Sequence, residues 1–292
     1  MNPLRAFRYV RGVARGVRRG DTFPEAGRVP AREAPGGSSS GPRLGARSFT
    51  LNELDVIETT EHVVPVAGLS RPVEILQLSD VHLRRPETWV ERLRAHVAGM
   101  KPDLVVLTGD IVTRGFTDEA VDLLLSGLPD APLGRFAIMG NWEYWGGAPL
   151  DIWEPLVARH GIRLLKDASV DLGPLWLVGT DDALAGAPDL DAAFSGVTDD
   201  RPILVLTHSP ALFPQIARPQ VRVVLAGHTH GGQVRLPLLG PFFLPRGSGI
   251  YPWGWYEQGG SWMFVSRGIG WSVAPVRFRS PPEVAVIRMV PG

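Results

Sequence analysis

The sequence predicts an α/β fold from about residue 49 to the end of the chain. Short apolar runs rich in Val, Ile and Leu alternate there with segments that can form helices, which is the rhythm of sheets with helical connections. With 292 residues, of which 44% are hydrophobic and 21% charged, the chain is long enough to bury a large core. A further observation supports the prediction, because five of the apolar runs are followed directly by Asp, Asn or His.

Each of these five runs has the length of a buried strand. In chain order, the runs and the residues that follow them are 73–79 with Asp80-Val81-His82, 103–108 with Gly109-Asp110, 136–139 with Gly140-Asn141, 203–207 with His208, and 221–226 with Gly227-His228-Thr229-His230. In open α/β sheets, ligands bind outside the carboxyl ends of the strands, so we expect these side chains to share one site. Residues two apart on an extended chain point to the same side. This spacing predicts that Asp80 and His82 reach one point, and that His228 and His230 do the same.

Seven side chains of this set have the chemistry of metal ligands: Asp80, His82, Asp110, Asn141, His208, His228 and His230. Carboxylate, amide oxygen and imidazole suit divalent ions such as Mn, Fe or Zn. The absence of cysteine excludes a thiolate-held metal, a disulfide framework and a thiol nucleophile. Seven ligands are too many for one tetrahedral ion, and they suit two ions that share a carboxylate and keep positions open for water.

In this order the motifs resemble those of the calcineurin-like metallophosphoesterases. The stretches 231–233, 236–240, 266–270 and 277–283 further resemble a bacterial, membrane-associated branch of that superfamily. Some members of the branch act on phospholipids or on lipid-linked pyrophosphates such as UDP-2,3-diacylglucosamine. The resemblance covers roughly residues 50–290 and implies a four-layer αββα sandwich of two facing mixed sheets, with two metal ions at one rim.

By position, the resemblance implies three ligands of a first ion, three of a second and one bridge between them: Asp80, His82 and His230, then Asn141, His208 and His228, then Asp110. It also implies that a hydroxide held between the ions attacks phosphorus in line. The activity expected on this basis is hydrolysis of a phosphoester or pyrophosphate bond.

One position departs from the pattern of the superfamily. Where Gly-Asn-His and an acidic residue are usual, this chain has Gly140-Asn141-Trp142-Glu143. The missing histidine normally contacts the phosphoryl oxygen or the leaving group, whereas an indole N–H donates a hydrogen bond but no proton at neutral pH. Three alternatives follow: a leaving group that needs no acid, a proton donor at the substrate in Glu143 or Asp182, or a slow enzyme. We favour the first.

Several basic and aromatic residues near these loops are candidates for substrate binding. Arg114 and Arg267 can clamp a phosphate, although solvation at the surface is the alternative for each. Trp145, Trp253 and Trp255 stand beside Gly or Pro in expected loops. They can form an apolar rim for a nucleobase, for acyl chains or for a membrane interface, and core packing is the alternative.

Residues 1–48 are expected to form a basic segment apart from the domain of residues 49–292. Residues 1–50 carry ten arginines and three acidic residues, a net charge of +7, although the whole chain has no net charge. Apolar residues three and four apart in 1–20 suit an amphipathic helix on an anionic membrane surface, with residues 20–48 as a flexible tether. A disordered basic leader is an equal alternative.

The basic segment lacks the apolar stretch that follows the arginine pair of an export signal. We therefore expect a cytoplasmic protein, with peripheral contact to the inner face of the cell membrane through this segment. No apolar run reaches the length of a membrane span. The balanced total charge gives no field that would favour nucleic acid, and the sequence carries no signal of an oligomeric state.

Three functions agree with these observations. The leading one is a two-metal phosphohydrolase whose substrate is a phosphorylated lipid or lipid-linked molecule. The second is a soluble phosphodiesterase for nucleotides or other small molecules, and the third is a metal-containing binding protein that lost turnover together with the histidine. The presence of all seven ligands argues against the third, because a decayed site need not retain them.

Overall fold

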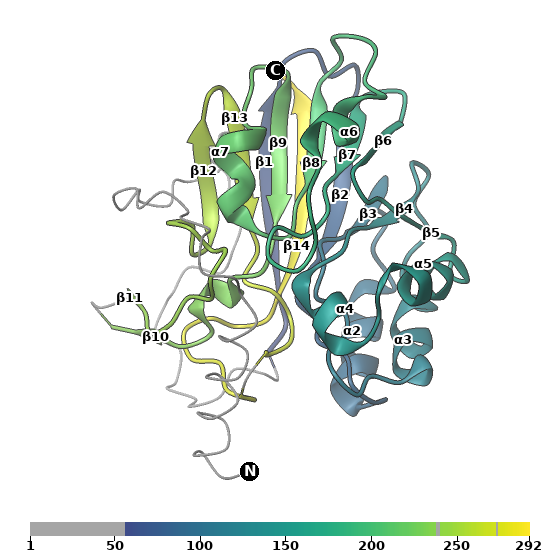
Figure 1. Cartoon of the computed structure of the whole chain (residues 1–292), viewed down its shortest axis with the longest axis vertical. Coiled ribbons are helices and arrows are strands. Elements are labelled where there is room, and N and C mark those ends of the chain that lie inside the picture. The colour runs from purple at the N-terminus through teal and green to yellow at the C-terminus, as the bar shows by residue number, and fades with distance from the viewer. Residues whose placement is uncertain (1–55, 238–239, 273) are drawn as a thin grey trace.

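The computed structural model describes residues 56–237, 240–272 and 274–292 (Figure 1). Within this part, two six-stranded sheets face each other and helices cover their outer faces, which is the predicted four-layer arrangement. The basic segment of residues 1–48 lies outside the described residues, so its expected helix and tether stay predictions. The described helices include none that is long and apolar enough to cross a membrane.

The first sheet contains the strands that precede the first four candidate ligands. Its strands, in spatial order, are β1 (Glu58–Val66), β14 (Glu283–Pro291), β2 (Val73–Leu78), β3 (Leu104–Leu107), β4 (Arg135–Ala137) and β5 (Ile162–Leu164). All neighbouring pairs are parallel except β14 and β2. The carboxyl ends of β2, β3 and β4 therefore meet at one edge of this sheet.

The second sheet contains the strands that precede the remaining histidines. Its spatial order is β12 (Gly254–Gln258), β13 (Ser261–Val265), β9 (Val221–Ala226), β8 (Ile203–Leu206), β7 (Trp176–Gly179) and β6 (Ala168–Asp171). The central pairs are parallel and the two outer pairs are antiparallel. A separate hairpin of β10 (Arg235–Leu236) and β11 (Gly240–Pro241) belongs to neither sheet.

Alternation along the central strands explains why both faces of each sheet are buried. In β3, Leu104 and Val106 enter the core between the sheets, and Val105 enters the core under the helices. In β8, Leu204 lies between the sheets and Val205 lies on the outer face. Strands buried on both faces are apolar throughout, which is why they appear as continuous runs in the sequence.

The helices close the outer layers of the sandwich. They are α2 (Thr88–Val97), α3 (Asp118–Leu125), α4 (Asn141–Gly146) and α5 (Leu150–Ala158) beside the first sheet, and α6 (Leu190–Phe194), the 3₁₀ turn η1 (Pro210–Leu212) and α7 (Phe213–Ile216) beside the second. A further 3₁₀ turn, η2 (His230–Gly232), follows β9. Local sequence sets some of these ends: the Thr117 hydroxyl accepts from the backbone N–H of Ala120 and caps α3.

Candidate metal centre

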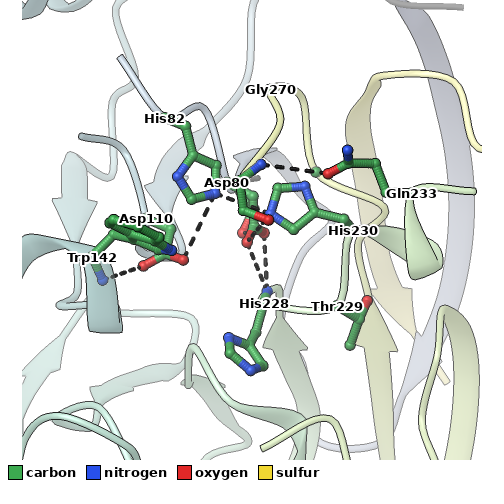
Figure 2. A network of polar contacts seen from close by, with 12 residues as sticks. Asp80, His82, Asp110, Trp142, His228, Thr229, His230, Gln233 and Gly270 are labelled. Atoms are coloured by element: carbon green, nitrogen blue, oxygen red, sulfur yellow. Dashed lines mark hydrogen bonds and ion pairs between the residues drawn. The ribbon is translucent and has the colours of Figure 1, made fainter. Parts of the chain in front are cut away.

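All seven candidate ligands lie in the segments that directly follow β2, β3, β4, β8 and β9. Each of the seven side chains is buried. Figure 2 shows five of them: Asp80, His82, Asp110 and His230 point toward one another, and the His228 ring points away from this group. The sequence-based expectation that strand-end residues meet at one rim is met in the fold.

The described residues contain two clusters of potential metal ligands, in each of which the ligand atoms lie within 4.8 Å of one another: Asp80, His82 and His230 form one, and Asp110, His208 and His228 form the other. The Asp110 Oδ2 atom lies 3.2 Å from His208 Nε2 and 3.8 Å from His82 Nε2, so this carboxylate stands between the clusters. The expectation that His228 and His230 reach one point is wrong, because each belongs to a different cluster.

The backbone explains why the extended-chain argument fails here. Of the eight described non-glycine residues with positive φ, five are candidate ligands: Asp80, His82, Asp110, His228 and His230, with φ between 52° and 72°. The left-handed conformation costs a non-glycine residue of the order of 1–3 kcal/mol and persists only where surrounding contacts enforce it. The ligand-bearing segments are therefore tight left-handed turns, and neighbouring histidines leave them in different directions.

Hydrogen bonds identify which nitrogen of two histidines faces the centre. A carbonyl oxygen only accepts, so the His208 Nδ1 atom, 2.8 Å from the Thr108 carbonyl, carries the hydrogen, as does His228 Nε2, 2.5 Å from the Arg246 carbonyl. The remaining nitrogens, His208 Nε2 and His228 Nδ1, face each other 3.2 Å apart, and a proton or a metal ion between them satisfies both.

The remaining donors also fit a metal ion. The side-chain oxygen of Asn141 is buried and has no hydrogen-bond partner in the described structure, which is the expected state of an oxygen that a metal would engage. In the first cluster, the Nε2 atoms of His82 and His230 lie 2.9 Å apart, and Asp80 Oδ1 is 3.4 Å from His230 Nε2. Carboxylate, amide and imidazole donors of this number suit two divalent ions.

The protonation of the centre follows from its burial. Burial lowers the pKa of His82 and His230 far below the ordinary value and that of His228 to about 3, so these imidazoles are neutral and able to bind a metal. Burial would also lower the pKa of His208, but carboxylates, Asp110 foremost, hold it well above its usual range. Burial raises the pKa of Asp110 to about 7. The negative charge of these carboxylates, which keeps a proton on the buried His208, also favours the binding of cations.

Glycines at two of the strand ends allow two loops to approach each other closely. A Cβ atom on Gly109 would lie 2.7 Å from His208 Nδ1, and one on Gly140 would lie 2.5 Å from the backbone nitrogen of Asp110. No side chain fits at either position, so the loops after β3 and β4 can pack directly against each other.

Glu143 holds the loop that carries Asp110. One oxygen of its buried carboxylate accepts from the backbone N–H groups of Asp110 and Gly140, at 2.9 and 2.7 Å. The other accepts from those of Ile111 and Val112, at 2.7 and 3.3 Å. The role of proton donor expected for Glu143 stays a prediction, and the contacts are those of a positioning residue.

Trp142 lies at the centre, as the sequence indicated. Its backbone N–H donates to Asp110 Oδ1 at 2.7 Å (Figure 2). Its buried ring meets the His82 ring edge to face, with centroids 5.9 Å apart, and the half-buried ring of Trp145 at 6.0 Å. The indole of Trp142 therefore occupies space beside a ligand of the first cluster.

The other substrate-binding candidates lie around the same rim. Arg114 is exposed, four residues after Asp110. The buried Asp182 accepts from two backbone N–H groups with Oδ2, while its Oδ1 has no partner among the described residues. Trp253 is half-buried under the guanidinium of Arg235, 3.5 Å from the ring centroid. Their roles in substrate binding stay predictions.

Two expectations about single residues are corrected by the structure. Arg267 is paired with Glu283 and Glu58, at 3.0 and 3.2 Å, and so serves a structural ion-pair network, which is neither of the two roles considered, a phosphate clamp or solvation at the surface. Trp255 lies in β12, is buried in the core between the sheets and donates to His62 Nδ1 at 3.2 Å. The glycine beside it, Gly254, is the first residue of the strand and does not mark a loop.

Sequence reasoning also missed Arg277, whose fully buried guanidinium lies 3.1 Å from His230 Nδ1. It donates to the carbonyls of Gly270, Arg267 and Ser280, and so ties the segment of residues 267–280 to the first cluster. The motif Arg277–Glu283 was the available signal, but the motif alone does not distinguish a buried arginine from an exposed one.

Comparisons with known proteins agree with this geometry. The family model described as calcineurin-like phosphoesterase matches residues 73–232. The chain is 32% identical over 251 residues to the uncharacterized metallophosphoesterase YkuE of Bacillus subtilis, covering 81% of this chain and 87% of that protein. It is 33% identical over 229 residues to the phosphodiesterase YaeI of Escherichia coli (75% and 83%), and 28% identical over 250 residues to the uncharacterized metallophosphoesterase Cj0846 of Campylobacter jejuni (82% and 64%).

The matched region begins at β2 and ends in η2, and it contains all seven candidate ligands. Enzymes of the matched family use divalent metals, in agreement with the two ligand clusters at the rim. The chain belongs to the calcineurin-like phosphoesterase family and is a metallophosphoesterase, a hydrolase of phosphoric esters.

Proposed function

We propose that this metallophosphoesterase hydrolyses a phosphodiester or pyrophosphate bond in a lipid-linked substrate, such as UDP-2,3-diacylglucosamine or a phospholipid, at the inner face of the cell membrane. The observation that carries the hydrolytic part is the pair of ligand clusters with Asp110 between them. The resemblance of the C-terminal stretches to a membrane-associated branch and the aromatic residues around the rim support the lipid part.

The seven ligands form two sets, which together can hold two ions of the Mn, Fe or Zn type. Asp80, His82 and His230 would hold one ion, Asn141, His208 and His228 the other, and Asp110 both. When bound, such ions supply an activated water molecule and neutralise charge on the phosphoryl oxygens. The Thr108 and Arg246 carbonyls fix the orientation of two imidazoles, and Glu143 fixes the loop of Asp110, so the ligands are positioned before a substrate arrives.

The absence of the family histidine favours substrates with a good leaving group. Trp142 can donate a hydrogen bond through its indole but cannot deliver a proton at neutral pH. A general acid typically contributes about 10²–10⁴-fold to the rate, and this contribution is largest for alkoxide leaving groups. A nucleoside monophosphate that leaves from a pyrophosphate needs no such proton, which agrees with a nucleotide-activated lipid as substrate.

A water-soluble phosphodiester is the second candidate substrate. It is favoured by the similarity to YaeI, a protein named as a phosphodiesterase. In that case the basic N-terminal segment would serve no membrane role.

The hydrolytic part is tested with bis(p-nitrophenyl) phosphate and Mn²⁺. We expect turnover that is lost with a chelator and in Asp110→Asn, whereas Asp151→Asn, which removes an exposed carboxylate on α5, leaves it unchanged. Equal turnover in wild type and Asp110→Asn would overturn the two-cluster site. A panel of UDP-2,3-diacylglucosamine, phospholipids, cyclic nucleotides and aryl phosphates then separates the candidates. Hydrolysis of the water-soluble members alone would overturn the lipid part and leave the hydrolase.

A further inference from the structure

An exposed aromatic pair directly follows the β10–β11 hairpin. Phe242 and Phe243 have exposed fractions of 74% and 56%, the two highest among the large exposed apolar residues of the described chain. Val276, with an exposed fraction of 40%, lies close to the start of the hairpin, because its carbonyl accepts from the side chain of Gln233. We call Phe242, Phe243 and Val276 the apolar tip because of this exposure. Phe242 pairs with Val234, so the aromatic pair lies at the base of the hairpin, which projects away from both sheets in Figure 1.

The apolar tip is connected directly to the first ligand cluster. The hairpin begins three residues after Gly232, the end of the turn that carries His230. A Cβ atom on Gly232 would collide with Pro241, so the returning strand packs against this turn. The Phe242 N–H donates to the Val234 carbonyl at 2.9 Å, and Figure 2 shows Gln233 beside His230. A surface bound by the tip would therefore lie next to the metal centre.

The charge around the tip is positive. Arg267 and Arg277, which are also close in sequence, are ion-paired or buried, so the positive charge beside the tip comes from Arg235, Arg246 and Arg279. Arg246, four residues after Phe242, and Arg279, next to Phe278, which forms an isolated bridge with Val234, are both exposed. Arg235 lies on the ring of Trp253. The combination is an exposed apolar tip with arginines and a tryptophan beside it.

We propose that the apolar tip inserts into the interface of an anionic phospholipid bilayer and holds the metal centre against the lipid phosphates. Aromatic side chains with basic neighbours favour the headgroup region, where rings meet acyl chains and arginines meet phosphate. A folded protein partner is less suited, because stable interfaces bury about 800 Å² on each side and strands of two residues offer a narrow, protruding surface. This membrane contact is separate from any made by residues 1–48, and it does not depend on the proposed substrate.

Because the chain contains no cysteine, a cysteine introduced at one position can be labelled at that position alone. The full chain carries a single label, an environment-sensitive nitrobenzoxadiazole, on Phe243→Cys or, as the control, on Ile152→Cys, an exposed apolar position on α5 with an exposed fraction of 47%. Vesicles of phosphatidylglycerol and phosphatidylcholine should shift the emission of the first label to the blue and increase it, and leave the second unchanged. Vesicles of phosphatidylcholine alone should give a smaller change.

The affinity for vesicles provides the second measurement. Phe242→Ser/Phe243→Ser should weaken co-sedimentation with anionic vesicles at least about tenfold, because two exposed aromatic rings lose their burial in the interface, whereas Ile152→Ser should not. Turnover of the soluble bis(p-nitrophenyl) phosphate should be the same in both variants, so a failed membrane contact is distinguished from a failed hydrolase.

Three results would overturn the proposal: vesicle binding without a change at label 243, which assigns binding to another segment; equal changes at labels 243 and 152; or full affinity in the double serine variant.

Discussion

The carboxylate of Glu143 offers the sharpest test of how the metal centre is positioned. Its two oxygens each accept from two backbone N–H groups, at distances between 2.7 and 3.3 Å. In Glu143→Gln, one of these oxygens becomes an NH₂ group, which faces two donors and accepts from neither. Hydrogen bonds to a charged acceptor contribute about 1.5–3 kcal/mol each, so the loss of two costs about 3–6 kcal/mol.

The lower end of this range is the expected value. Burial raises the pKa of Glu143, which means that the charged form is desolvated at a cost that the neutral amide avoids. We therefore expect the free energy of unfolding to fall by about 3 kcal/mol. Because the loops of Asp110 and Asn141 lose their common anchor, metal affinity should fall about 10–100-fold, as for other residues that orient metal ligands.

Urea unfolding, followed by tryptophan fluorescence with and without Mn²⁺, measures the first quantity, and calorimetric titration with Mn²⁺ measures the second. The control is Glu91→Gln, which removes an exposed carboxylate on α2 and should change neither. If Glu143→Gln kept full stability and metal affinity but lost turnover on alkyl phosphates alone, the positioning role would be refuted, and Glu143 would be the proton donor that the sequence analysis considered.

Three further outcomes are expected. Trp142→His should keep the metal content and raise turnover on alkyl phosphates at least about tenfold, since it restores a general acid; equal rates in a steady-state assay would contradict this. His62→Gln should flatten the loss of stability below pH 6.5: burial lowers the pKa of His62, so the unfolded chain takes up a proton that the folded protein does not. Urea unfolding between about pH 7 and about pH 5 should show up to about 1.4 kcal/mol per pH unit less loss than wild type, and parallel profiles would exclude His62. Gly270→Ala should destabilise the protein by about 1–3 kcal/mol, because the added methyl group would overlap the Val81 carbonyl; thermal unfolding at an unchanged midpoint would contradict the packing.

Much of the fold and the ligand set follows from local sequence. Strands buried on both faces, such as β3 and β8, are necessarily apolar throughout, so their positions are visible as runs. The residue types that bind metals are few, and they stand where those runs end. The glycines before Asp110 and Asn141 stand where two loops pack too closely for a side chain.

Other features depend on contacts between distant segments and left no local pattern. Glu143 follows Asn141 in sequence like any residue of a helix, yet its carboxylate reaches the backbone of Ile111 and Val112. Arg277 lies in a segment of Pro, Ser and Arg, and only its packing against His230 shows that it is buried. Trp255 stands beside glycine, as a loop residue would, but the opposite sheet covers it.

The sequence by itself determined the α/β class, the five strands that precede the ligands, the identity of the seven candidate ligands and their order along the chain. These properties depend on residue type and on the period of a strand, both of which are local. The division of these ligands into two sets with Asp110 as bridge was implied only by the resemblance to a family. The tertiary structure alone decided how the distant side chains meet in two clusters and that Glu143 holds the loop of Asp110. The reason is that left-handed turns at the strand ends direct His228 and His230 to different clusters. Which side chains these turns bring together depends on how the two sheets pack against each other, and the local sequence does not encode that packing.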